Sequence, residues 1–213
     1  MAQLQTYPVT LDTVSFDHKP TNDDTKYITL RMQRAGHVEV TAEELGNAVR
    51  TGVTHCCGCF KPSPNGWGEF VCARLASLDF DNMRTVKRGK KKVSVPLKHC
   101  EFGWISPTMA IYRCMSMLGM VPVVVYETFS STEKHPKFRI IIDLAPLVGG
   151  DGIIRDESQA LETFSRLRKI YPEADNKTEH KNRYNRLMYG TGGNNAEYWR
   201  DISGWEHDLE GVE

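Results

Sequence analysis

The sequence of 213 residues has no apolar run long enough to cross a bilayer. Its longest apolar stretch, residues 120–125, contains a proline, whereas a membrane-spanning helix needs about 20 apolar residues. The first residues also lack the basic and apolar segments of a signal peptide. We therefore expect an intracellular, cytoplasmic protein without membrane contact, whose six cysteines are reduced thiols or metal ligands rather than disulfides.

An excess of charge of one sign is also missing, because 27 basic side chains balance 27 acidic ones. This balance argues against a histone-like polycation but permits a local basic patch. Apolar residues make up 40% of the chain and charged residues 25%, which argues against a wholly disordered or fibrous chain. We expect one domain or a compact pair.

The pattern of apolar residues predicts strands and helices that alternate along the chain. Residues 1–26 are polar and aperiodic, so we expect a loosely docked lead-in there. The capping residues Thr41 and Ser106 each open a predicted helix. The other predicted elements are strands at 27–32, 72–81, 123–126, 138–142 and 186–190 and a helix at 157–171. These elements indicate an α+β fold with a mixed or antiparallel sheet and flanking helices.

The strand at 72–81 carries two aspartates on an otherwise apolar segment. Asp79 and Asp81 are two residues apart, so they share one face of the strand. Each carboxylate raises the cost of ionising the other, and a divalent cation removes that cost. Mg²⁺ and Mn²⁺ prefer such hard oxygen ligands. The alternative is a solvated edge strand, because an isolated pair of this kind often occurs by accident.

A second polar group lies in a predicted hairpin. A turn rich in hydroxyl groups leads through His135 into a returning strand, on which Lys137 and Arg139 share a face. Arginine can hold a phosphate with two hydrogen bonds and lysine with a point charge, so the pair could bind a triphosphate. A solvated strand face is the equally simple alternative.

Residues 87–92 contain five cations, and they follow the strand of aspartates directly. Such a run is usually solvated surface. At this place it could instead contact a nucleic-acid backbone, which would position the nucleic acid without reading its sequence. The expected contacts are Lys87, Arg88, Lys90, Lys91 and Lys92.

The cysteines offer only half of a zinc site. Cys56 and Cys59 have the spacing of one zinc knuckle, but no second pair has matching spacing. His55 and Cys72 are the nearest further ligands in sequence. We favour reduced thiols in a packed loop over a Zn²⁺-dependent nucleic-acid-binding protein.

Four stretches, in order, resemble motifs of the archaeo-eukaryotic primase superfamily, and in particular its plasmid- and phage-type replication proteins. Residues 78–81 resemble the first motif, in which two aspartates alternate with apolar residues on a strand. The hairpin at 128–139 resembles the second, Thr-Phe-Ser-His-Thr followed by Pro-Arg-Phe-Arg. Residues 52–77 and 175–190 are similar to the upstream and closing segments. The order makes the match more specific than any single motif.

The resemblance implies a primase or primase-polymerase core with an RRM-like sheet and an N-terminal α/β module. It implies a DNA replication enzyme that uses Mg²⁺ or Mn²⁺, an NTP or dNTP, and a single-stranded or primed DNA template, with a helicase domain or partner. The implied metal-binding, catalytic residues are Asp79, Asp81 and Asp175, with Asp143 as a rival for the third place because it ends a strand. The implied nucleotide contacts are Ser130, Ser131, His135, Lys137 and Arg139, and Arg186 is an implied DNA contact.

The chain departs from this family at one point. The second motif of the family ends in a histidine, where this chain has Ser130, Ser131 and Thr132. Either His135 reaches the same phosphates, or the site binds them with one group fewer. The second case would favour a replication initiator or nucleic-acid-binding module without turnover. We expect residues 1–40 to be a lead-in and first strand within the core, 41–195 the catalytic domain, and 196–213 a polar tail leading to a further domain.

Overall fold

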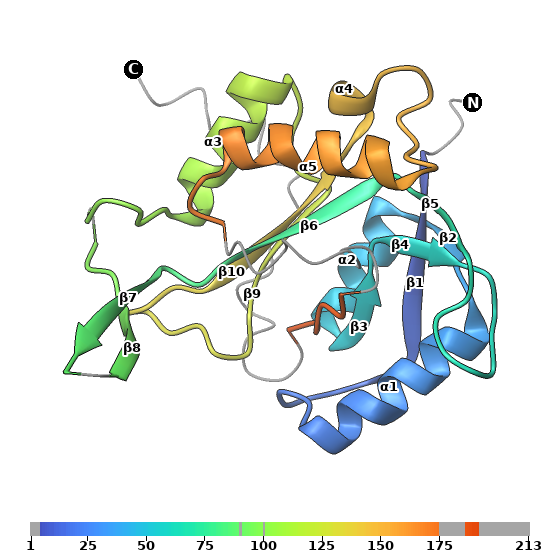
Figure 1. Cartoon of the computed structure of the whole chain (residues 1–213), viewed down its shortest axis with the longest axis horizontal. Helices are drawn as coiled ribbons and strands as arrows, with labels where there is room; N and C mark the ends of the chain where they lie inside the picture. The colour runs from blue at the N-terminus through green and yellow to red at the C-terminus, as the bar shows by residue number, and fades with distance from the viewer. Residues whose placement is uncertain (1–4, 90, 100, 175–185, 192–213) are drawn as a thin grey trace.

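The computed structural model describes residues 5–89, 91–99, 101–174 and 186–191 (Figure 1). Its elements, in chain order, are β1 (Thr6–Ser15), α1 (Asn22–Ala35), β2 (Val38–Thr41), α2 (Ala42–Arg50), β3 (Val53–Cys56), β4 (Gly58–Phe60), β5 (Phe70–Ala73), β6 (Leu75–Phe80), β7 (Met83–Arg88), β8 (Lys91–Pro96), α3 (Pro107–Leu118), β9 (Val124–Glu127), β10 (Phe138–Asp143), α4 (Ala145–Val148) and α5 (Glu157–Ile170). The strand pairs are antiparallel, which confirms the α+β class with an antiparallel sheet. No helix in these residues is both long and apolar enough to cross a membrane.

The sheet that positions the candidate site has the order β6-β10-β9. One of its faces packs against α3 and α5, which lie above it in Figure 1. Phe80 of β6 and Phe138 of β10 pair across the strands on this face, and their rings stack with centroids 4.7 Å apart. Because side chains alternate along a strand, Asp79 and Arg139, the neighbours of these two aromatic residues in sequence, face the opposite side of the sheet.

The N-terminal layer covers only part of that opposite side. Tyr7 and Val9 of β1 and Leu45 of α2 pack in one apolar cluster with Leu75 of β6 and Ile141 of β10. Leu75 lies at the start of β6, whereas Asp79 lies near its end. The apolar cluster therefore covers one half of the sheet face and leaves the half with the aspartates open.

The first 35 residues differ from the sequence prediction. The predicted lead-in at 1–26 and strand at 27–32 are both wrong within the described residues. β1 is instead the central strand of the sheet β2-β1-β3. Helix α1 opens with a capping box, in which Thr21 accepts a hydrogen bond from the Asp24 amide at 3.2 Å and the Asp24 carboxylate accepts one in return. Ile28 and Met32, four residues apart, form its buried face.

The other predicted helices are confirmed. Thr41 caps α2 through the amide of Glu44, and Ser106 caps α3 through the amide of Met109. Gly52 follows α2 with a φ of 89°, where an added Cβ would lie 1.8 Å from the carbonyl oxygen of Phe16. A glycine is required at this close approach, and it lets β1 pack against the end of the helix.

Candidate functional site

A polar pocket opens on the uncovered half of the β6-β10-β9 sheet. Its volume is about 160 Å³. The lining comes from four separate parts of the chain: Lys19, Asp79, Asp81, Thr128, Phe129, Ser130, Lys137, Arg139 and Tyr189. Five of these are predicted site residues, namely Asp79, Asp81, Ser130, Lys137 and Arg139. The structure thus brings together the predicted acidic and basic residues of two distant motifs.

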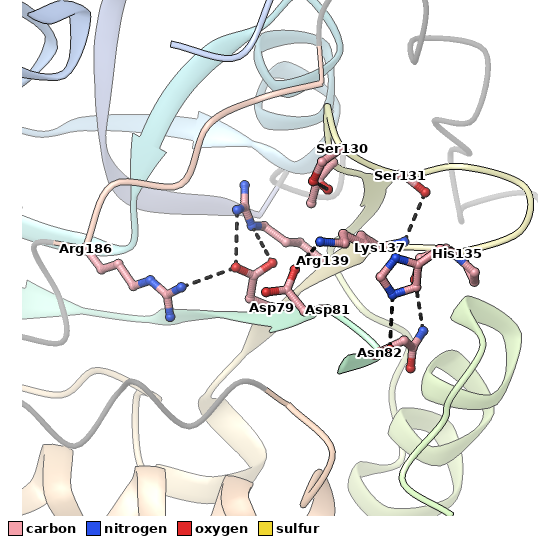
Figure 2. A network of polar contacts seen from close by, with 11 residues as sticks. Asp79, Asp81, Asn82, Ser130, Ser131, His135, Lys137, Arg139 and Arg186 are labelled. Carbon is pink, nitrogen blue, oxygen red and sulfur yellow. Dashed lines mark hydrogen bonds and ion pairs between the residues drawn. The ribbon is translucent and has the colours of Figure 1, made fainter. Parts of the chain in front are cut away.

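The strand register explains how these residues meet. Arg139 lies directly opposite Asp79 on one side and Tyr126 on the other, so the three form a row across the sheet. Figure 2 shows the Arg139 guanidinium against the Asp79 carboxylate. The Nε–Oδ1 distance is 3.0 Å and the Nη2–Oδ2 distance is 3.3 Å. Lys137 stands two residues before Arg139 on the same face, with its Nζ 3.7 Å from Oδ1 of Asp81.

The two aspartates lie in different surroundings. The Asp79 side chain is 7% exposed, and Oδ2 also accepts a hydrogen bond from Nη2 of Arg186 at 3.2 Å. The Asp81 side chain is 36% exposed, and its distance to Lys137 is too long for a hydrogen bond. Arginine charges therefore already compensate Asp79, while Asp81 is the carboxylate accessible from the pocket.

The segment 186–191 closes one side of the pocket through several contacts. The backbone oxygen of Tyr189 accepts hydrogen bonds from Nη1 of Arg139 at 2.8 Å and from the Tyr126 hydroxyl at 3.3 Å. Burial raises the pKa of Tyr126 to about 12, so this phenol stays protonated and can donate. The Tyr189 hydroxyl lies 2.8 Å from Oγ1 of Thr25, which ties the segment to α1.

His135 lies outside the pocket lining. Its Nε2 is 3.1 Å from the backbone oxygen of Asn82, and since a carbonyl oxygen only accepts, Nε2 carries the hydrogen (Figure 2). Ser131 is also outside the lining, where its Oγ accepts a hydrogen bond from the Lys137 amide at 3.0 Å. Both residues brace the hairpin, whereas Ser130 lines the pocket.

The two candidates for a third carboxylate are not brought to the pocket. Asp143 pairs with Leu75 at the far end of β10, four residues and about 13 Å along the strand from Arg139. It is 3.1 Å from Nη2 of Arg74, and it also accepts a hydrogen bond from the amide of Ala145. Asp175 lies outside the described residues. No group of three His, Cys, Asp or Glu side chains in the described ranges could hold a metal ion, and this includes the cysteine cluster.

The predicted basic loop is wrong as a loop, because residues 83–88 and 91–96 form the hairpin β7-β8. Lys87, Lys91 and Lys92 are exposed on it, while Lys90 and the side chain of Arg88 lie outside the described part of the chain. In Figure 1 the hairpin projects from the end of β6, the end that carries the aspartates. Lys87 faces Lys92 across the strands. Like charges directly opposite one another destabilise a strand pair, and a bound polyanion would relieve this repulsion.

Four pocket residues have no role in the sequence prediction. Lys19 lies in the predicted lead-in, and Thr128, Phe129 and Tyr189 lie close in sequence to predicted site residues. Tyr189 lies in the segment that resembles the closing motif of the primase superfamily, so that resemblance is a usable signal for it. For Lys19 the sequence offers no such signal, because only the folding of β1 and α1 brings this residue to the sheet.

Asn82 turns the chain from β6 into β7. It adopts a φ of 46°, a conformation that asparagine tolerates better than most residues. Its Nδ2 donates to the carbonyl oxygens of Ile105 and Pro136, both at 2.9 Å, and its Oδ1 accepts from the Ile105 amide at 3.0 Å. One side chain thus joins the end of β6 to the segment before α3 and to the turn that leads into β10.

Replacing Asn82 with alanine is expected to lower the free energy of unfolding by at least about 2 kcal/mol, because two buried hydrogen bonds and one partly buried hydrogen bond disappear. Asn82→Gly removes the same hydrogen bonds but relieves the backbone, so it should be more stable than Asn82→Ala by about 1 kcal/mol. Urea unfolding of the three proteins measures both differences. Equal midpoints for all three would contradict this role.

Comparison with known proteins yields no match, whether to a family model, to a curated protein or to a solved structure. Function therefore has to be argued from the geometry of the pocket.

Proposed function

We propose that the chain is a template-directed nucleotidyltransferase, the catalytic core of a primase or primase-polymerase. The observation that carries this proposal is the pocket, which collects Asp79 and Asp81 from one sequence motif and Ser130, Lys137 and Arg139 from another. Adjacent carboxylates and cations are the groups that phosphoryl transfer requires. A solvated edge strand, the competing interpretation, gives no reason for the two sets to share one cavity.

The two aspartates suit a Mg²⁺ or Mn²⁺ ion that is held together with substrate. Both carboxylates line the same pocket and supply hard oxygen donors. Mg²⁺ is commonly bound by one or two carboxylates plus substrate phosphates, so a third protein carboxylate is not required. When bound, the cation would neutralise phosphate charge and favour attack by a hydroxyl group. Asp81 is the more accessible ligand, and Asp79 would exchange part of its contact with Arg139 or Arg186.

The basic residues suit the polyphosphate of a nucleotide. Lys19, Lys137 and Arg139 line the pocket together with the Ser130 hydroxyl. The cavity of about 160 Å³ is smaller than the roughly 300–1,000 Å³ of a typical small-molecule site. We infer that the pocket receives the phosphates, while the sugar and base lie outside it, where a template strand could pair with the base. The β7-β8 hairpin would contact the backbone of that strand.

Replacing Lys87, Lys91 and Lys92 with glutamine is expected to weaken binding of single-stranded DNA about equally for all sequences, because lysines that bind phosphates do not read bases. The slope of log affinity against log salt should flatten by about 0.7 for each phosphate that the variant no longer neutralises. Fluorescence anisotropy across a salt series measures both quantities. Thermal stability should not fall, since the substitution removes the repulsion between Lys87 and Lys92.

The matched control replaces Lys26, Lys61 and Lys169, which are exposed elsewhere on the surface, with glutamine. It makes the same change in net charge and should keep most of the parent's salt slope. If the two triple variants bind DNA with equally reduced affinity, the hairpin is a solvated spacer and the template contacts lie elsewhere.

One observation favours a non-catalytic DNA-binding module on the same fold. Both oxygens of Asp79 are held by arginines, so the charge of this carboxylate is compensated without a metal ion. In that case Arg139 and Arg186 would be structural partners of Asp79. The missing histidine of the second motif agrees with this alternative.

Titration with Mn²⁺ and a nucleoside triphosphate separates the two functions. The nucleotidyltransferase should bind the triphosphate much more tightly with Mn²⁺ than without it, and Asp81→Asn should remove this dependence. Asp23→Asn, at an exposed aspartate of α1, is the control that should leave it intact. Binding of DNA together with metal-independent or absent nucleotide binding would support the non-catalytic module.

A further inference from the structure

Two cysteines face each other across the β4-β5 strand pair, away from the pocket. Cys59 of β4 is the direct partner of Cys72 of β5, and both are free thiols. Directly opposed residues of antiparallel strands have Cα atoms about 4.5 or 5.5 Å apart. Both separations lie within the range of about 4.4–6.8 Å that a disulfide spans. The backbone is therefore already arranged for a bond between these residues.

The two thiols have unequal surroundings. Cys59 is fully buried, whereas Cys72 is half-buried and reachable from the surface. A hydrogen bond from the Cys59 thiol to Cys72 lowers the pKa of Cys72, and the Arg155 guanidinium adds to this effect, while burial and Glu39 oppose it. The same hydrogen bond raises the pKa of Cys59, and burial raises it further. Cys72 is thus favoured as a thiolate while Cys59 keeps its proton.

The other described cysteines lack this arrangement. Burial raises the pKa of Cys56 to about 12 and that of Cys114 to about 11, and it also raises the pKa of Cys57. A thiolate is the nucleophile in thiol chemistry, so these buried, protonated thiols are not expected to react first with an oxidant. Among the residues that the structure describes, reactivity is therefore concentrated at Cys72.

We propose that Cys59 and Cys72 form a reactive dithiol that a hydroperoxide oxidises to a cross-strand disulfide. The Cys72 sulfur attacks a peroxide oxygen and the O–O bond breaks. With hydrogen peroxide, the leaving hydroxide takes a proton and becomes water, and Cys72 becomes a sulfenic acid. The Cys59 sulfur then attacks the Cys72 sulfur, the S–O bond breaks, and the hydroxide leaves as water with the proton of Cys59. In total, two thiols and one hydrogen peroxide give one disulfide and two water molecules.

This reaction is separate from the proposed nucleotidyl transfer. Cys72 lies in β5, close to the start of β6, because only Ala73 and Arg74 separate it from Leu75. The N-terminal layer covers this end of β6. The aspartates stand near the opposite end of β6. The disulfide would join β4 to β5 and close the segment 59–72, which stabilises the fold by restricting the unfolded chain. We expect a higher unfolding temperature and an unchanged pocket.

The test treats the reduced full-length chain with a small excess of hydrogen peroxide, blocks the remaining thiols and maps the peptides by mass spectrometry. Before blocking, the expected product is lighter than the reduced chain by two hydrogen atoms and returns to the parent mass with dithiothreitol. After blocking, it carries two blocking groups fewer than the parent and contains a peptide linking Cys59 to Cys72. Cys59→Ser should accumulate a sulfenic acid at Cys72 that dimedone traps, while Cys72→Ser should form no link. Cys114→Ser is the control that should behave like the parent.

Three results would overturn the proposal. They are a disulfide between other cysteines, oxidation of Cys72 to a sulfinic acid while Cys59 stays a thiol, and survival of both thiols under conditions that oxidise free cysteine. Because the parent chain alone distinguishes these products, the test stands even if Cys59→Ser does not fold. Cys59→Ala provides the second variant for the trapping step.

Discussion

Asp81→Asn is expected to reduce nucleotide incorporation at least about 100-fold while leaving the unfolding temperature near that of the parent, because the variant lacks one ligand of a catalytic cation. The side chain is partly exposed, and its contact with Lys137 spans 3.7 Å, so little structural energy depends on it. Rates on a primed template and a thermal melt give the two quantities. Full activity of the variant with both Mg²⁺ and Mn²⁺ would remove Asp81 from the site.

Asp79 should behave differently from Asp81. Asp79→Ala is also expected to abolish incorporation, but it leaves the guanidinium of Arg139 buried without its carboxylate. Removing one partner of a buried ion pair typically costs about 3–5 kcal/mol, so this variant should be clearly destabilised. The mutual repulsion of the two aspartates, which the sequence alone emphasises, is outweighed by the arginines that the fold brings to Asp79.

Arg139→Lys is expected to weaken nucleotide binding by about 1–3 kcal/mol, because lysine cannot reproduce the planar fork of hydrogen bonds. The variant should also be less stable, since Arg139 holds both Asp79 and the backbone oxygen of Tyr189. Isothermal titration with a nucleoside triphosphate and Mn²⁺ measures the affinity.

Arg74→Lys is the matched control for this decrease in stability. Arg74 forms an ion pair with the buried Asp143 at the far end of the same sheet, outside the pocket. The control should be destabilised in the same way but keep its nucleotide affinity. If Arg74→Lys and Arg139→Lys change the affinity equally, Arg139 is a structural residue and not part of the nucleotide site.

The period of the strands was enough to predict which side chains share a face. Asp79 and Asp81 alternate with Leu78 and Phe80, and the latter pair packs in the core between the sheet and the helices α3 and α5. Lys137 and Arg139 follow the same rule on β10. The sequence could not reveal the register that places Arg139 opposite Asp79, because cross-strand pairing depends on the turn and on packing between distant segments.

The N-terminal region was mispredicted because local signals there compete. Residues 27–32 fit a strand pattern, but Ile28 and Met32 also fit the helix period, and the capping box at Thr21 settles the choice in favour of α1. Lys19 could not be assigned to the pocket without that helix.

The position of His135 in the hairpin predicts a nucleotide contact, whereas in the structure its ring lies against Asn82. This contact joins residues 53 positions apart in the sequence, so the sequence alone could not reveal it.

Nucleotide incorporation on single-stranded templates of defined sequence tests the proposed template-directed transfer most directly. The purified chain is supplied with one labelled nucleotide at a time and with Mg²⁺ or Mn²⁺, with and without an annealed primer. Template-directed transfer predicts that only the nucleotide complementary to the next template base is added, that chelation of the metal stops the reaction, and that Asp81→Asn removes it. No incorporation of any nucleotide, by a folded chain that binds the same templates, would contradict nucleotidyl transfer and favour the non-catalytic module.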